Sequence, residues 1–206
     1  MHRSHVTTLL LAGALIAGAA NAQAGFQKIF NGKNLEGLAL VGVTPDTFKV
    51  QDGVLVCSGK PNGYFATMKS YRNYVLRFDW KYVRPAGLQK DSDFDGNSGL
   101  LIHITGEHKV WPKCIEVQLM NKDAGNVFGL GSAVQGKKDA AAQARAIKPV
   151  GEWNREEVTC KDGTIAARIN DILVGEGSGS NPAEGTIGWQ SEGAEIHFRN
   201  IEIKEL

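Results

Sequence analysis

The 206-residue sequence lacks three features that would point to common functional classes: an excess of one charge, many cysteines and long apolar runs. Basic and acidic side chains number 23 and 22, and a formal net charge of +1 argues against a broad nucleic-acid-binding surface. Three cysteines, Cys57, Cys114 and Cys160, have no metal-site spacing and allow at most one internal disulfide. We expect them to pack as small hydrophobic side chains. The signature motifs of α/β-hydrolases, zinc proteases, P-loop proteins and dinucleotide-binding folds are also missing, which argues against those chemistries.

The main apolar run, residues 9–20, is too short to form a stable transmembrane anchor. It follows His2, Arg3 and His5 and ends in the stretch Ala-Asn-Ala-Gln-Ala at residues 20–24. A charged start, a short apolar run and an A-x-A site are typical of a cleaved signal peptide, although a buried N-terminal helix is the alternative. We therefore expect residues 1–24 to direct export, periplasmic or secreted, and residues 25–206 to form a single domain.

Glycine is abundant, with 25 of 206 residues, or about 12% against a usual value of about 7%. No collagen period is present, so the glycines predict turns between short strands. The strongest strand signal is at residues 74–82, where apolar and polar side chains alternate with a period of two. The pair Asp52-Gly53 predicts a hairpin between two short strands.

Further strands are predicted over residues 98–105, 114–120, 156–160, 164–169, 172–174, 186–190 and 195–203. A helix of one or two turns is expected at residues 139–146, inside a long loop from about residue 121 to residue 154. Many short strands and little helix predict an all-β fold, a two-sheet antiparallel sandwich or jelly roll.

Polar side chains occupy alternate positions on two of these strands. Aliphatic residues at alternate positions of 114–120 share one face, which leaves Glu116 and Gln118 on the other. His103 lies on the preceding strand, and pairing of the two strands would bring all three side chains to one sheet face. A carboxylate, an amide and an imidazole on a concave face can bind sugar hydroxyls, because each hydroxyl both donates and accepts. The alternative is a solvated outer face.

Aromatic side chains near predicted loops or strand ends offer a second means of binding sugars. Tyr64, Trp111 and Trp189 have this placement. The CH face of a pyranose packs against such rings, so we expect them to contact a carbohydrate.

Three carboxylates, Asp91, Asp93 and Asp95, stand at alternate positions before Gly96. This spacing begins like a calcium-binding loop, so a Ca²⁺ site is one interpretation. The twelfth position from Asp91 is Ile102, not the bidentate glutamate of an EF-hand, so a solvated acidic loop is the alternative.

The segment at residues 26–37, Phe-Gln-Lys-Ile-Phe-Asn-Gly-Lys-Asn-Leu-Glu-Gly, resembles the F-x-x-L-F-N-G-K-D-L-x-G-W opening of the DUF1080 family. This family is also called the 3-keto-disaccharide hydrolase domain. Further family motifs are matched in order at residues 52–55, 97–99, 116–118, 151–154, 188–193 and 198–201. His103 and Asn121 depart from it, since they stand where the family pattern has arginine and aspartate.

The resemblance implies a concanavalin A-like lectin/glucanase sandwich and a carbohydrate or glycoside ligand. In a hydrolase or lyase acting on 3-keto-glycosides, Glu116 would be the base and His103 the acid or enolate stabiliser. The remaining candidates would bind substrate or line the rim: Asn97, Gln118, Tyr64, Trp111, Gln190, Glu192 and Arg199. A non-catalytic carbohydrate-binding module and a structural or partner-binding domain are the alternatives. Substrate, linkage, metal requirement and oligomeric state stay open.

Overall fold

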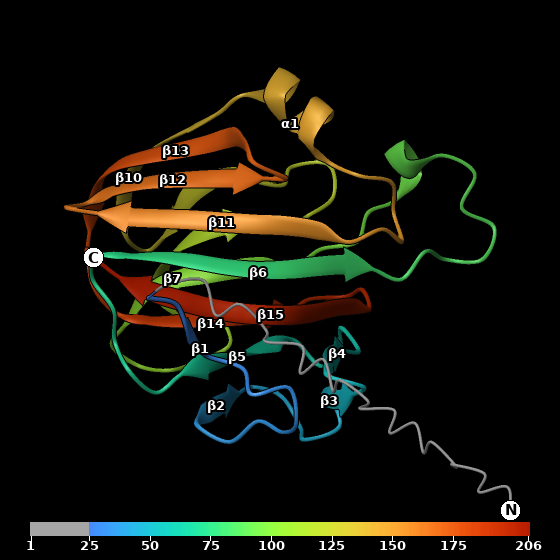
Figure 1. The fold of residues 1–206 in the computed structure, drawn as a ribbon, viewed down its shortest axis with the longest axis horizontal. Helices are drawn as coiled ribbons and strands as arrows, with labels where there is room; N and C mark the ends of the chain where they lie inside the picture. Colours follow the sequence, from blue (N-terminus) through green and yellow to red (C-terminus); the bar gives the residue numbers. More distant parts are fainter. Residues whose placement is uncertain (1–24) are drawn as a thin grey trace, which may run out of the picture.

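The structure is a computed structural model of the 206-residue chain, and it describes residues 25–206. The predicted signal peptide, residues 1–24, lies outside the described residues and stays a prediction. Two antiparallel β-sheets stack face to face and form a sandwich (Figure 1). The predicted all-β, two-sheet architecture is confirmed.

The larger sheet has nine strands and the smaller sheet has six. Along the large sheet the order is β10 (Ala133–Lys138), β13 (Ile172–Asn181), β12 (Thr164–Ile169), β11 (Asn154–Lys161), β6 (Tyr74–Tyr82), β15 (Ile196–Glu205), β4 (Val54–Cys57) and β3 (Phe48–Gln51), and β1 (Gln27–Lys28) pairs with β15. Along the small sheet the order is β2 (Leu38–Val41), β5 (Gly63–Thr67), β14 (Thr186–Ser191), β7 (Gly99–Thr105), β8 (Lys113–Gln118) and β9 (Val127–Leu130).

The hydrophobic core lies between the two sheets. In β6 the side chains at alternate positions are buried, as the alternation of residues 74–82 predicted. Strand β14 is buried at all of its positions, and its Trp189 lies in this core, where it stacks on Phe65 with ring centroids 4.9 Å apart. Trp189 is fully buried, and the expectation that it contacts a carbohydrate is therefore wrong.

Residues 121–154, predicted as a loop, contain β9 and β10 as well as a helix. Short strands that contain glycine, such as β9, have too few side chains to display a period of two. The predicted helix is present as α1 (Ala140–Ala146), and the carboxylate of Asp139 caps it by accepting a hydrogen bond from the N–H of Ala142 at 2.9 Å.

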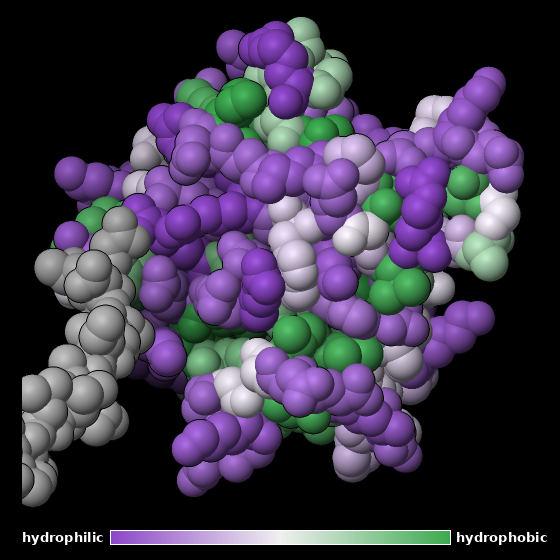
Figure 2. Space-filling model, turned by 45° about the vertical axis from the view of Figure 1, so that its right-hand side comes forward, coloured by the Kyte–Doolittle hydropathy of each residue, from purple (hydrophilic) through white to green (hydrophobic). Residues whose placement is uncertain are grey.

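The three cysteines are buried and free, as expected for small packed side chains. On the face seen in Figure 2 hydrophilic residues predominate, and apolar ones are exposed only in separate small areas. No helix within residues 25–206 is long and apolar enough to cross a membrane.

Candidate functional site

The outer face of the small sheet carries Glu116. Its neighbours Ile115 and Val117 point into the core, so the glutamate side chain points the other way. Glu116 pairs directly with Leu101 on β7 and with Phe128 on β9. The carboxyl group therefore lies between two apolar side chains, in a position that is poorly hydrated.

Gln190 on β14 reaches the same point from the other side of β7. A Cβ atom added at Gly99 would overlap both Oε1 of Glu116 and Oε1 of Gln190. The two polar ends therefore meet above Gly99, and glycine is the residue that leaves them room. This close approach explains why β7 begins with a residue that has no side chain.

Burial controls the protonation of Glu116. The residue is only 4% exposed, and burial raises the pKa of its carboxyl group from 4.5 to about 8. The negative charge of Glu192 adds to the rise, and the Gln190 carboxamide opposes it. Glu116 is therefore mainly protonated at neutral pH.

Glu192 and Asn97 lie beside this position, at the end of the small sheet. The two residues form an isolated β-bridge between the segments that follow β14 and precede β7. Burial raises the pKa of Glu192, and its contact with Asn97 lowers it. Both residues also line a hollow of about 500 Å³, to which Phe94 and Gly193 contribute. Glu192 is thus the more accessible of two neighbouring carboxyl groups.

Within residues 25–206, several buried polar atoms around Glu116 have no hydrogen-bond partner. They are the hydroxyl of Tyr64, Oδ1 of Asn97 and the carboxamide of Gln190, which approaches the Glu116 carboxyl without forming a well-aligned hydrogen bond. Tyr64 pairs with Gln190 across β5 and β14, and burial raises the pKa of its hydroxyl to about 12. Unpaired buried polar groups are costly, so a hydroxyl-rich ligand or ordered water would stabilise this arrangement.

Gln118 lies on the same face as Glu116, as predicted, but its side chain is engaged by the backbone. Its Oε1 accepts hydrogen bonds from the N–H groups of Leu119 (2.9 Å) and Met120 (2.8 Å). Oε1 of Gln118 thus fixes the backbone at the end of β8. Of this side chain, only the Nε2 group is left to donate a hydrogen bond to a ligand.

His103 does not join Glu116, and the prediction that they share a face is wrong. A bulge interrupts β7 after Ile102, and His103 adopts a positive φ of 54°. The ring therefore turns toward the large sheet, where Nδ1 lies 3.2 Å from the Ser180 hydroxyl and the ring packs edge-on to Tyr74. Burial lowers the pKa of His103 to about 4, so it is neutral at physiological pH.

Arg199 is also remote from Glu116, because it lies on β15 in the large sheet. Its Nε donates to Asp79 at 3.0 Å, and its guanidinium lies 4.0 Å from the centre of the Trp153 ring. Trp111 is 47% exposed in the loop between β7 and β8, where it lines a separate hollow with Leu130. Neither residue is brought to Glu116.

The acidic loop does not assemble a metal site. Asp91 forms an ion pair with Arg84 and accepts the N–H of Val150 at 2.9 Å, while Asp95 forms an ion pair with Lys122. Within residues 25–206, no group of three acidic, histidine or cysteine side chains could hold a metal ion. The carboxylates diverge toward separate partners, so the calcium interpretation of Asp91, Asp93 and Asp95 is wrong.

Phe128 is the site residue that sequence reasoning missed. It lies beside Glu116 and is partly exposed. In the sequence, its strand shows only as the short apolar run at residues 127–130, which falls inside the loop predicted for residues 121–154.

The chain matches a known family over nearly all of the described residues. Residues 25–204 match the model of the 3-keto-alpha-glucoside-1,2-lyase-like domain, so the chain belongs to this family, and the resemblance stated from its motifs is confirmed. It is similar to a 3-keto-disaccharide hydrolase of Bacteroides thetaiotaomicron, with 23% identity over 246 residues covering 88% of this chain and 79% of the relative.

Two solved structures are similar in fold. A candidate glycosyl hydrolase from Parabacteroides distasonis ATCC 8503 has a TM-score of 0.65 and 22% identity, with 88% of this chain and 94% of that chain covered. Carbohydrate-binding module CBM66 from Bacillus subtilis has a TM-score of 0.61 and 15% identity, with 84% and 98% covered. At these identities the similarity establishes a shared sandwich fold.

Proposed function

We propose that this member of the 3-keto-alpha-glucoside-1,2-lyase-like family is a hydrolase or lyase that acts on 3-keto-glycosides, with a 3-keto-disaccharide as substrate. The observation that carries the proposal is the burial of Glu116 between Leu101 and Phe128, where it meets Gln190 above Gly99. The curated relative named 3-keto-disaccharide hydrolase supports the substrate class.

The chemistry requires one base and one acid. A ketone at C3 of the sugar acidifies the hydrogen at C2, and a base removes that proton to form an enolate. The electron pair then forms a C1–C2 double bond as the C1–O bond breaks, and the leaving oxygen takes a proton from an acid. Addition of water to this double bond, with OH at C1 and H at C2, completes a net hydrolysis.

Two neighbouring carboxyl groups with different environments suit these two roles. Glu116 is protonated at neutral pH, so we assign it as the acid that protonates the leaving oxygen. Glu192 is more accessible, and we assign it as the base that takes the C2 proton. This reverses the role expected for Glu116 from the family resemblance, because a base must be ionised before it acts.

The unpaired polar groups would orient the sugar. The hydroxyl of Tyr64 and the carboxamide of Gln190 can each donate to and accept from a sugar hydroxyl, and Oδ1 of Asn97 can accept. Phe128 would pack against the CH face of a pyranose ring beside Glu116. The leader-like residues 1–24 support export of the chain, as proposed from the sequence.

The second candidate function is a non-catalytic carbohydrate-binding module. The same unpaired polar atoms favour it, because they would hold a sugar whether or not a bond is broken. The structural similarity to CBM66 is compatible with such a role.

Turnover of a 3-keto-disaccharide separates the two candidates. Purified protein would be incubated with 3-keto-trehalose or 3-keto-sucrose, and release of the second sugar would be measured. We expect turnover in the wild type, a loss of about 100-fold or more in Glu116→Gln and Glu192→Gln, and no change in Glu36→Gln, an exposed glutamate outside the hollow.

Binding of the sugar without turnover in the wild type would favour the binding module. Turnover that persists undiminished in Glu116→Gln would exclude the assignment of Glu116 as the acid.

A further inference from the structure

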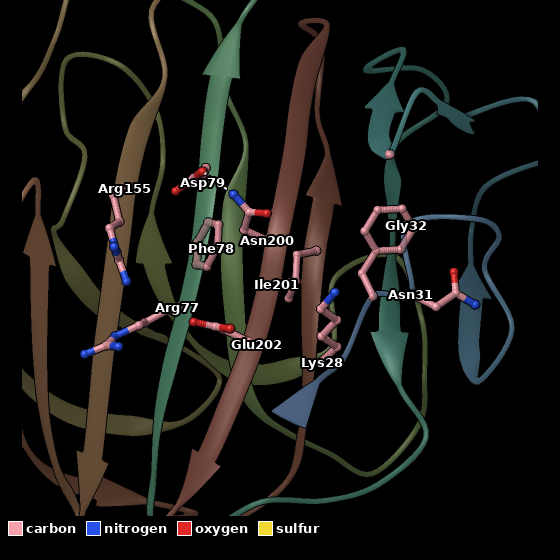
Figure 3. Close-up of a pocket in the computed structure, with 12 residues that line it drawn as sticks. Lys28, Asn31, Gly32, Arg77, Phe78, Asp79, Arg155, Asn200, Ile201 and Glu202 are labelled. Atoms are coloured by element: carbon pink, nitrogen blue, oxygen red, sulfur yellow. Dashed lines mark hydrogen bonds between the residues drawn. The ribbon is translucent and has the colours of Figure 1, made fainter. Parts of the chain in front are cut away.

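The outer face of the large sheet carries a pocket that the proposed function does not use. Its volume is about 480 Å³, within the range of about 300–1,000 Å³ usual for small-molecule sites. The floor comes from β11, β6 and β15, and Lys28, Asn31 and Gly32 form the wall (Figure 3). Gly53 also lines the pocket. Since Glu116 lies on the outer face of the small sheet, the two sites are on opposite sides of the sandwich.

A defect in β15 shapes the floor of this pocket. The register of β15 against β6 shifts between Arg199 and Glu202, and Asn200 adopts a positive φ of 53°. Bulges of this kind occur next to functional sites, where they redirect a side chain. Here the bulge places Asn200 so that its Nδ2 donates to Asp79 at 2.7 Å (Figure 3).

The wall is held rigid by local hydrogen bonds. Oδ1 of Asn31 accepts the N–H groups of Lys33 (2.8 Å) and Asn34 (2.9 Å), and Gly32 has a φ of 75°. This Asx-type turn holds its shape without a ligand. A rigid wall lowers the conformational cost of binding.

The segments that carry the family resemblance divide between the two faces. The Glu116 site is formed by residues 97–99, 116–118 and 188–193. The pocket on the outer face of the large sheet, here called the outer pocket, is lined by members of residues 26–37, 52–55 and 198–201. The Glu116 site therefore leaves four of the seven segments without a function, and three of these four meet at the outer pocket.

We propose that the outer pocket is a second saccharide-binding site, which holds a neutral sugar unit without cleaving it. Its lining contains both hydrogen-bond donors and acceptors: Lys28, Arg155 and Asn200 can donate, and Asp79 and Glu202 can accept. Within the described residues, Lys28 and Arg155 form no ion pair. A sugar hydroxyl uses both a donor and an acceptor, and such a mixed lining matches a row of hydroxyls.

Other ligand classes fit this lining less well. The carboxylate of Glu202 would repel an anion such as a phosphate, whereas that of Asp79 is already paired with Arg199. The basic side chains of Lys28, Arg77 and Arg155 would repel a cation. The apolar side chains at the floor, Phe78 and Ile201, are buried, so an apolar ligand would find few partners. The pocket would hold one end of a longer glycan while another part of that glycan is free.

Side-chain NMR signals can test this site directly. The amide signals of Asn31 and Asn200 and the Nε signal of Arg155 would be followed while trehalose, sucrose, maltose or cellobiose is added to the isotope-labelled protein. We expect saturable shifts with at least one disaccharide, and a dissociation constant about tenfold higher in Arg155→Ala and in Glu202→Gln. The shifts should persist in Glu116→Gln, so that this site and the Glu116 site are tested separately.

Arg72→Ala is the matched control, because Arg72 is exposed and lies outside the pocket. It should bind the sugar as the wild type does. Three results would overturn the proposal: no disaccharide shifts these signals, Arg155→Ala and Glu202→Gln bind as well as the wild type, or inorganic phosphate binds more tightly than every neutral sugar. A well-dispersed spectrum of each variant establishes that it is folded.

Discussion

A buried glutamate that lies outside both sites, Glu156, should make the stability of this protein fall as pH rises. Glu156 on β11 is 0% exposed and points into the core. Its Oε2 accepts a hydrogen bond from Nε1 of Trp80 at 3.1 Å, but its Oε1 has no partner among the residues that the structure describes. Burial raises the pKa of this carboxyl group from 4.5 to about 8, and the Trp80 hydrogen bond only partly opposes the rise.

The direction of this pH dependence follows from the protons that Glu156 binds in the folded and the unfolded chain. Between pH 4.5 and about 8 the folded chain keeps Glu156 protonated, while the unfolded chain has released that proton. Stability contributed by this group is therefore complete at low pH and is lost as pH rises through this window. At about 1.4 kcal/mol per pH unit inside the window, the free energy of unfolding should fall by about 3 kcal/mol between about pH 5 and about pH 7.5.

The substitution Glu156→Gln removes this titration and keeps the shape and the oxygen that faces Trp80. Urea unfolding at both pH values would measure it, and the pH-dependent loss should be smaller in the variant by about 3 kcal/mol. Glu116 also titrates in this range, so the variant should keep part of the wild-type slope. Glu36→Gln, at an exposed position, should keep all of it. If Glu156→Gln and the wild type lose the same free energy, the reasoning about Glu156 is refuted.

Four further predictions concern the sites and the residues excluded from them. Turnover of a 3-keto-disaccharide should fall as pH rises through about 8, because Glu116 then loses the proton that it must donate; a rate unaffected by this change would contradict its role as an acid. Gly99→Ala should reduce turnover by about tenfold or more, because the added methyl group pushes Glu116 and Gln190 apart, while circular dichroism reports an intact fold. Arg199→Ala should lower the free energy of unfolding by about 1 kcal/mol and leave turnover unchanged, since its ion pair and ring contact lie on the large sheet. The His103 ring should titrate near pH 4 by NMR. The free energy of unfolding should therefore decline as pH falls below 6.5, the usual pKa of histidine, because the unfolded chain takes up a proton there and the folded chain does not. A midpoint near 6.5 would show that the ring is hydrated.

Period-two patterning explains which strands could be predicted. The nine residues of β6 alternate over their whole length, so both their conformation and their buried face could be read from the sequence. Strands β2, β5 and β9 have four or five residues each, and β5 is buried at every position. A strand that is short, or buried on both faces, shows no alternation, and these strands were missed.

The same limit applies to the site. The face of Glu116 followed from its alternation with Ile115 and Val117, and that placement agrees with the structure. His103 was misplaced because a bulge shifts every later residue of a strand to the opposite face, and no local pattern announces it. The partners of Glu116 come from β7, β9 and β14, which are far apart in the chain.

The sequence alone determined the fold class, the family and the face on which Glu116 lies, because these depend on local periodicity and on motifs that are contiguous in the chain. Only the tertiary structure decided that Gln190 meets Glu116 above Gly99, that His103 turns away, and that three other motif segments converge on the opposite sheet. The protonation of Glu116 was decided there too. A pKa depends on burial and on nearby charge, and both arise from residues that only folding brings together.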